Sequence, residues 1–215
     1  MAETVLLYVA LLTLLVSGAG TLLASTLGVP LGAYLGSRNF RGRRLLRGSL
    51  QSLYGLPPVL LGLLLYLTLS RTGPLGNLRW LFTVQGMVLA QFLLVLPFVT
   101  GLTWSAVANV DPTVRDTART LGAEGRTYLT TLVREARSGI IAAVMVGFGR
   151  AISEVGAVII VGGNIQGETE VLTTAIVKET GRGDFALAVG LGIILLAMSV
   201  IVFAGLTFLQ EEERK

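Results

Sequence analysis

The sequence contains no cysteine and no histidine. Their absence excludes disulfides, thiol nucleophiles, Cys/His metal sites and catalytic triads that use histidine as the base. The sequence also lacks a Gly-xxxx-Gly-Lys-[Ser/Thr] phosphate loop, since neither Lys178 nor Lys215 ends a glycine-rich loop. We therefore expect no catalytic residue, no metal site and no cofactor in this chain.

Charged residues are scarce, at 14% of the chain against about 25% in soluble domains, and 53% of the residues are hydrophobic. So few charges do not cover a water-facing surface, whereas the 27 glycines suit helices that pack closely in lipid. The formal charge of +4 does not indicate nucleic acid as a partner, because the basic residues lie in short segments between apolar runs. The composition predicts an all-α integral membrane protein.

Apolar runs long enough to cross a bilayer occur at residues 4–35, 53–70, 81–107, 139–161 and 185–209. They predict about five transmembrane helices in a single domain, residues 1–215. The first run is long enough to tilt or to include an interfacial stretch. Its start resembles a signal peptide, but it carries Glu3 without a basic residue and continues past a plausible cleavage site. We expect it to remain as a span.

Clusters of basic residues predict the orientation in the plasma or inner membrane. The loops after the first and third runs and the C-terminus carry Arg38, Arg41, Arg43, Arg44, Arg47, Arg115, Arg119, Arg126, Arg134, Arg137, Arg214 and Lys215. The alternate loops carry only Arg71, Arg79, Lys178 and Arg182. Because basic loops stay in the cytoplasm, we expect the N-terminus outside and the C-terminus inside.

Glycine and proline mark two further features. Gly28, Gly32 and Gly36 share one helical face and predict a close helix crossing, either in a moving core or as ordinary membrane packing. Pro57 and Pro58 lack amide donors, so the second span is expected to start or break there, facing other helices.

The segment at about residues 108–138 predicts a cytoplasmic elbow of two short amphipathic helices. Asp111-Pro112 is typical of a helix start, and Gly122 of a helix end. The expected apolar faces consist of Val114, Ala118 and Leu121 in the first helix and Tyr128, Leu129, Leu132, Val133 and Ala136 in the second. The pattern alone favours docking to a partner protein and lying on anionic lipid equally.

The residues Asp116-Thr-Ala118-xxx-Gly122 resemble the EAA loop of ABC importer permeases, with Asp116 and Thr117 in place of Glu and Ala. Arg134-Glu135 stands where a Leu-Pro pair closes the usual pattern. The resemblance implies coupling helices that dock on an ATPase subunit. The coupling residues that it implies are Asp116, Thr117, Ala118, Arg119, Gly122, Ala123 and Arg126.

Several segments resemble the tungstate-type permeases more narrowly. They are Gly55-Leu-Pro-Pro-Val59, Leu132-Val-Arg-Glu-Ala-Arg137, Phe148-Gly-Arg-Ala-Ile-Ser-Glu-Val-Gly-Ala157, Gly162-Gly-Asn-Ile165 and Leu172-Thr-Thr-Ala-Ile-Val177. This resemblance implies the type I ABC importer permease fold, a homodimer, an extracytoplasmic oxyanion-binding protein, and an ATPase partner that holds ATP and Mg²⁺. The implied cargo is tungstate, with molybdate or sulfate as alternatives.

Arg150 and Glu154 lie within the fourth run, at i and i+4. A charge at the bilayer centre costs about 2.5–3.5 kcal/mol, so both should face protein or water. They are expected either to line or gate the anion path or to form a buried ion pair that fixes helix packing. If Arg150 lines the path, Arg150→Ala should impair transport without abolishing assembly.

The segment 162–184 carries Glu168, Glu170, Glu179 and Asp184 against Lys178 and Arg182. This excess of acid predicts a negative outer surface that repels a free dianion, which favours delivery by a docked binding protein. Neutral side chains that offer hydrogen bonds to an oxyanion in the path are Asn164, Thr173 and Thr174.

Two other classes of protein remain alternatives. A secondary transporter driven by an ion gradient needs intramembrane carboxylates, and Glu154 is the only acidic residue well inside a run. A membrane scaffold could use the elbow as an anchor but does not account for the charged pair. A membrane enzyme is disfavoured, because no nucleophile–base pair or metal-binding group of residues is present.

Overall fold

The computed structural model of the chain describes residues 2–212, which form helices and connecting turns without a strand. The α-helices are α1 Ala2–Ser37, α2 Arg43–Ser52, α3 Pro58–Leu69, α4 Val84–Ala108, α5 Pro112–Thr120, α6 Gly125–Glu135, α7 Arg137–Ile152, α8 Gly156–Gly162, α9 Leu172–Arg182 and α10 Phe185–Glu212, with 3-10 turns η1 Leu53–Gly55 and η2 Gly76–Leu78. The predicted all-α membrane fold is confirmed.

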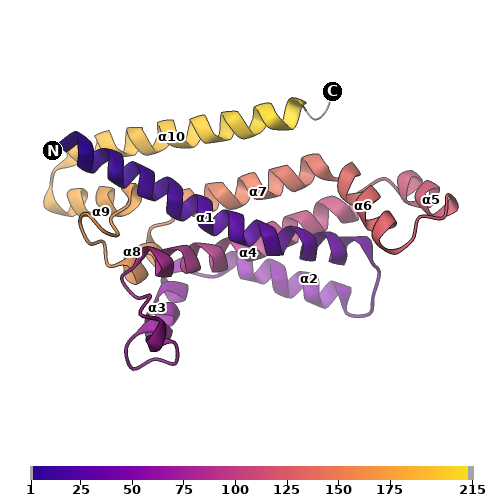
Figure 1. Cartoon of the computed structure of the whole chain (residues 1–215), viewed down its shortest axis with the longest axis horizontal. Coiled ribbons are helices and arrows are strands. Elements are labelled where there is room, and N and C mark those ends of the chain that lie inside the picture. The colour runs from indigo at the N-terminus through magenta and orange to yellow at the C-terminus, as the bar shows by residue number, and fades with distance from the viewer. Residues whose placement is uncertain (1, 213–215) are drawn as a thin grey trace.

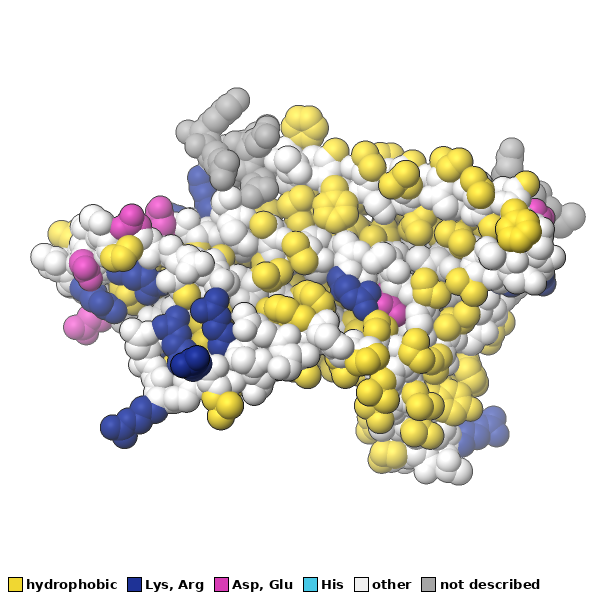
Figure 2. Space-filling view, turned by 180° about the vertical axis from the view of Figure 1, so that it is seen from behind, with side chains coloured by type: hydrophobic (Ala, Val, Ile, Leu, Met, Phe, Trp, Pro, Cys, Tyr) yellow, Lys and Arg dark blue, Asp and Glu magenta, His cyan; other side chains and the backbone are white. Residues whose placement is uncertain are grey.

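The long helices α1, α4, α7 and α10 follow the long axis of the molecule (Figure 1). Helices α5 and α6 lie at one end, and α9 lies beside the N-terminus at the other. Charged side chains gather at the α5–α6 end, whereas hydrophobic side chains dominate the rest of the face shown in Figure 2. This division is that of a bundle that crosses lipid and ends in water.

Three described helices, α1, α4 and α10, are long and apolar enough to span a membrane, and the count reaches five if each of two bent helix pairs is one span. The predicted first, third and fifth runs match α1, α4 and α10, and the second and fourth fall on the bent pairs. The first run is one continuous helix that includes Pro30. In α10 only 11% of the apolar window is buried inside the molecule, so most of that helix is free to face lipid.

The predicted second span, residues 53–70, is not one helix. The turn η1 ends at Gly55, α3 begins at Pro58, and the axes of the two bent halves differ by 91°. Leu56 and Pro57 have ψ angles of 118° and 123°, because a residue before proline avoids the α region. The arginine-rich segment before this break, expected as a loop, is the amphipathic helix α2.

The tight crossing predicted from the glycine spacing is confirmed between α1 and α4. A Cβ atom on Gly32 would lie 2.3 Å from the Thr100 carbonyl oxygen, and one on Gly36 would lie 2.8 Å from that of Trp104. Ala24, Val95 and Val99 lie buried where the two helices meet α7. This contact forms the centre of the bundle.

Candidate functional site

The predicted fourth span, residues 139–161, is broken in the middle. Helix α7 ends at Ile152, α8 begins at Gly156, and their axes differ by 57°. Arg150 therefore lies in the last turn of α7, while Glu154 lies in the break and not on the same helix, as the i, i+4 argument assumed. The two still form an ion pair, with Arg150 Nη1 2.6 Å from Glu154 Oε2.

Glu154 joins the elements around the break. Its Oε1 accepts a hydrogen bond from the Ala157 amide at 3.0 Å, at the start of α8. Its carbonyl oxygen accepts the Thr173 hydroxyl of α9 at 2.9 Å. The Glu154 side chain is 3% exposed, whereas that of Arg150 is 26% exposed. The carboxylate thus ends inside the protein, and the guanidinium reaches the surface of the chain.

A small polar interior surrounds this break. Gln91 of α4 donates to the Ala151 carbonyl at 2.8 Å, and its Oε1 has no hydrogen-bond partner among the described residues. Thr13 of α1 accepts the Leu172 amide at 2.9 Å. The interior space that these side chains line beside Glu154 is too narrow for a water molecule.

The three neutral path candidates lie in different surroundings. Thr173 contacts Glu154 as described, so the structure brings it to the charged pair. Thr174 is fully buried, and its hydroxyl bonds to the backbone of Val171. Asn164 has a left-handed φ of 51°, and its buried Oδ1 has no partner among the described residues. None of the three presents a free hydroxyl or amide to the charged pair in this conformation.

The structure shows how the charges at residues 162–184 are distributed. Glu170 and Glu179 are 3% and 8% exposed. Lys178 pairs with both carboxylates, and Arg182 lies 3.0 Å from Glu179. These pairs neutralise Glu170 and Glu179, so the negative charge of the segment is concentrated on Glu168 and Asp184, which are exposed.

The elbow has the predicted architecture. The Asp111 carboxylate accepts the Thr113 amide at 2.7 Å and begins α5. Hydrogen bonds from Thr113 hold the pKa of the Asp111 carboxyl below its ordinary value, because they favour the charged form. Gly122 has a φ of +77°, which reverses the chain between α5 and α6.

The inner face of the elbow packs as predicted for α6, and its outer face carries the proposed coupling residues. Leu132 is fully buried against Ala33 of α1 and Val107 of α4. The members of the EAA-like segment that point to solvent are Asp116, Thr117, Arg119, Gly122 and Arg126, whereas Ala123 is half-buried and Ala118 is buried. The structure therefore brings these residues together at one end of the molecule.

A family comparison agrees with this arrangement. Residues 28–214 match the family described as "Binding-protein-dependent transport system inner membrane component". The chain belongs to this family. It is a membrane-spanning permease subunit.

Two relatives match the permease over most of its length. It is 42% identical over 201 residues to the "Tungstate uptake system permease protein TupB" of Peptoclostridium acidaminophilum, covering 94% of this chain and 88% of the relative. It is 40% identical over 200 residues to a "Probable anion ABC transporter permease protein" of Haloferax volcanii, covering 91% and 86%. A "Molybdenum transport system permease protein ModB" of Haemophilus influenzae is 32% identical over 149 residues, covering 66% and 65%.

One residue of the permease elbow was predicted wrongly from the sequence. Leu121, expected on the inner stripe of α5, is 81% exposed at the tip. The helix ends at Thr120, so the spacing that placed Leu121 on the stripe no longer applies. Arg115 donates from Nε to the Val110 carbonyl at 3.2 Å and also bonds to the Val107 carbonyl, which ties α5 to the end of α4. The exposed Leu121 gives the elbow an apolar tip.

Proposed function

We propose that this permease forms the translocation path of an ATP-driven importer for a tetrahedral oxyanion, with tungstate as the cargo. The observation that carries the proposal is the 42% identity to a tungstate uptake permease over 94% of the chain. Molybdate and sulfate are the competing cargoes, because they share the tetrahedral dianion geometry and molybdenum permeases are also related.

The partners in this proposal are a cytoplasmic ATPase with ATP and Mg²⁺ and an extracytoplasmic oxyanion-binding protein. The ATPase docks on the elbow, where Leu121 offers an apolar anchor between charged side chains. Asp116, Arg119 and Arg126 flank this tip and set its orientation. The N-terminus is outside and the C-terminus in the cytoplasm, as the distribution of arginines favours.

Two copies of the chain form the path. Arg150 is partly exposed on a span, and a charge facing lipid there would cost about 2.5–3.5 kcal/mol. A second copy that covers this face removes the guanidinium from lipid and lets it line a shared passage. In this arrangement Arg150 and Glu154 are the candidates for the gate. Thr173 holds the break between α7 and α8 through its hydrogen bond to the Glu154 carbonyl.

Transport by the reconstituted complex tests the cargo. Proteoliposomes would hold the permease with the ATPase encoded beside it, and binding protein loaded with tungstate, molybdate or sulfate would be added in turn. We expect ATP hydrolysis and uptake to rise with the tungstate-loaded form. A response only to molybdate or sulfate would reassign the cargo. No response from an intact complex, together with uptake driven by an ion gradient, would favour a secondary transporter.

Gly122→Val should uncouple ATP hydrolysis from transport. Valine at a φ of +77° is strained by about 1–3 kcal/mol, which shifts the equilibrium constant against the native elbow by about 5- to 150-fold. We expect uptake per ATP hydrolysed to fall about tenfold while the protein still inserts and assembles. The measurement is the ratio of uptake to hydrolysis in proteoliposomes.

Gly42→Val is the matched control for this prediction. Gly42 has a φ of +86° and, like Gly122, has no atom within 4 Å of where its Cβ would lie. Gly42 lies before α2 and outside the elbow, so valine at this position introduces similar backbone strain at a different place. Equal loss of coupling in both variants would show that general strain, and not the elbow, is responsible.

A further inference from the structure

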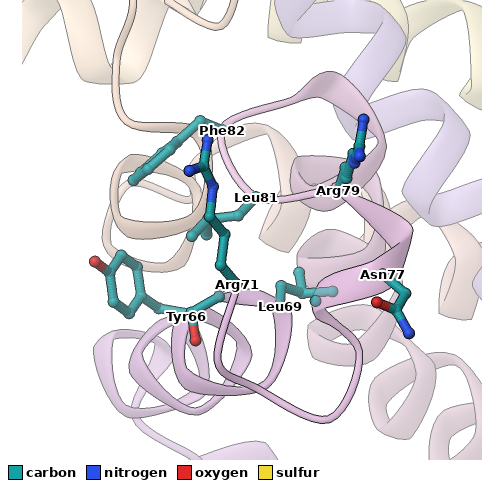
Figure 3. A pocket seen from close by; sticks show the side chains of 9 residues that line it. Tyr66, Leu69, Arg71, Asn77, Arg79, Leu81 and Phe82 are labelled. Carbon is teal, nitrogen blue, oxygen red and sulfur yellow. The ribbon is translucent and has the colours of Figure 1, made fainter.

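The loop between α3 and α4, residues 70–83, folds around a pocket of about 990 Å³, which we call the loop pocket. Its lining includes Tyr66, Ser70, Arg71, Asn77, Arg79 and Phe82. In Figure 3 the side chains of Arg71 and Arg79 both rise from the loop, Arg71 beside Phe82 and Arg79 on the opposite side of the view. In Figure 1 the loop and α3 project to one side of the bundle.

The two arginines of the loop pocket carry unneutralised charge. Lys178 and Arg182, the other basic residues of the proposed outer side, are paired with Glu170 and Glu179. Among the side chains that the structure describes, no ion pair joins Arg71 or Arg79 to a carboxylate. Arg150 is likewise neutralised, by Glu154 at 2.6 Å. Among the described side chains of the proposed outer side, unpaired positive charge is thus confined to this loop.

The loop is tightly built, unlike an ordinary solvated connection. A Cβ atom on Gly73 would lie 2.2 Å from the Leu67 carbonyl oxygen, and one on Gly76 would lie 2.4 Å from that of Ser70. Arg79 and Phe82 adopt left-handed φ angles of 54° and 61°. Such residues cost about 1–3 kcal/mol each and cluster at ligand-binding sites, where the surrounding structure holds them. The backbone therefore fixes where the Arg79 side chain leaves the loop.

The loop is also joined to the element beside the charged break. The Phe82 amide donates to the Val161 carbonyl of α8 at 2.8 Å. A Cβ atom on Gly163 would lie 2.7 Å from the Phe82 ring, so loop and helix end are in direct contact. Because α8 begins next to Glu154, an occupant of the pocket contacts a segment that connects to the proposed gate.

We propose that the loop pocket receives the tetrahedral oxyanion on the outer side before it enters the path, with Arg71 and Arg79 as its ligands. This inference rests on the proposed function. Arginine suits it, because the planar guanidinium binds tetrahedral oxyanions with paired hydrogen bonds. Unpaired positive charge also raises the local concentration of a dianion that a binding protein has released. The phosphate of a lipid headgroup presents the same chemistry and is the competing source.

Direct binding of free tungstate tests the pocket. Permease–ATPase complex in nanodiscs of neutral phosphatidylcholine would be titrated calorimetrically with sodium tungstate, without binding protein. We expect Arg71→Gln/Arg79→Gln to weaken binding at least about tenfold and Arg71→Lys/Arg79→Lys to restore part of it. The control is Arg41→Gln/Arg44→Gln, which removes the same charge from exposed cytoplasmic positions and should bind as the wild type does.

The outcomes separate this inference from the proposed function. Equal tungstate affinity in the wild type and the double glutamine variant, with assembly checked by size-exclusion chromatography, would overturn the pocket. Uptake driven by the loaded binding protein would then still support the importer. Stabilisation by anionic phosphatidylglycerol without tungstate binding would assign the pocket to lipid and also overturn the inference. If the double variant does not assemble, each single variant is expected to weaken binding, and unchanged singles would count against the proposal.

Discussion

Arg150→Met is expected to lower the free energy of unfolding by about 3–5 kcal/mol, and the additional change Glu154→Gln to restore most of it. The Glu154 side chain is only 3% exposed, and Arg150 at 2.6 Å is its charged partner. Removing the arginine leaves a buried carboxylate without compensation, which costs more than the pair itself contributes. Glutamine removes that charge and keeps an oxygen that can accept the Ala157 amide. Thermal unfolding in detergent measures both variants.

The rescued double variant also decides between the two roles that the sequence left open. If the pair only fixes packing, a stable Arg150→Met/Glu154→Gln permease transports normally. If the guanidinium acts on the anion, the double variant assembles but takes up tungstate poorly. Arg150→Met as stable as the wild type would contradict the prediction, since it would mean that Glu154 does not depend on its partner.

The span boundaries followed from hydropathy wherever a helix is straight and apolar throughout. The runs that predicted α1, α4 and α10 needed only enough length to cross a bilayer. The break between α7 and α8 was not predictable in this way, because the two helices together are long and apolar enough to count as one span. Tertiary contacts hold it: Glu154 bonds to the α8 amide of Ala157 and receives Thr173 from a segment 19 residues away.

Site residues that depend on local turn chemistry were predicted correctly, whereas those that depend on tertiary contacts were not. The position of Gly122 followed from local turn chemistry, and its φ of +77° agrees. The charge count at residues 162–184 gave the net charge but not which acids are paired, because pairing of Glu170 with Lys178 depends on how the chain folds back after the turn. The loop pocket could not be predicted from the sequence. The course of its loop depends on left-handed φ angles at Arg79 and Phe82, which no propensity favours.

Gly32→Ala is expected to destabilise the permease by about 1–3 kcal/mol, although it adds a single methyl group. The new Cβ would lie 2.3 Å from the Thr100 carbonyl oxygen and 3.0 Å from the Trp104 amide nitrogen. Both are backbone atoms of α4, so no rotamer change relieves the contact and the helices must separate. Melting temperature and the yield of monodisperse protein in detergent measure the loss.

Gly18→Ala is the control in the same helix, and its expected effect has the opposite sign. No atom lies within 4 Å of the position of its Cβ, and alanine favours a helix over glycine by about 1 kcal/mol. Gly28→Ala should fall between the two, because its nearest contact is the Thr100 side-chain oxygen at 2.9 Å, which can rotate away. Equal effects at Gly18 and Gly32 would contradict a close crossing of α1 and α4.

The same series distinguishes a crossing that moves during transport from one that only holds the bundle together. If α1 and α4 stay fixed, uptake by each variant falls only in proportion to the folded protein that remains. If the two helices slide during the cycle, uptake by Gly28→Ala falls further than the loss of folded protein accounts for. The added methyl group then obstructs intermediate positions that the resting state does not occupy. Uptake normalised to assembled protein, compared across Gly18→Ala, Gly28→Ala and Gly32→Ala, therefore reports on motion at the contact that the glycine spacing first indicated.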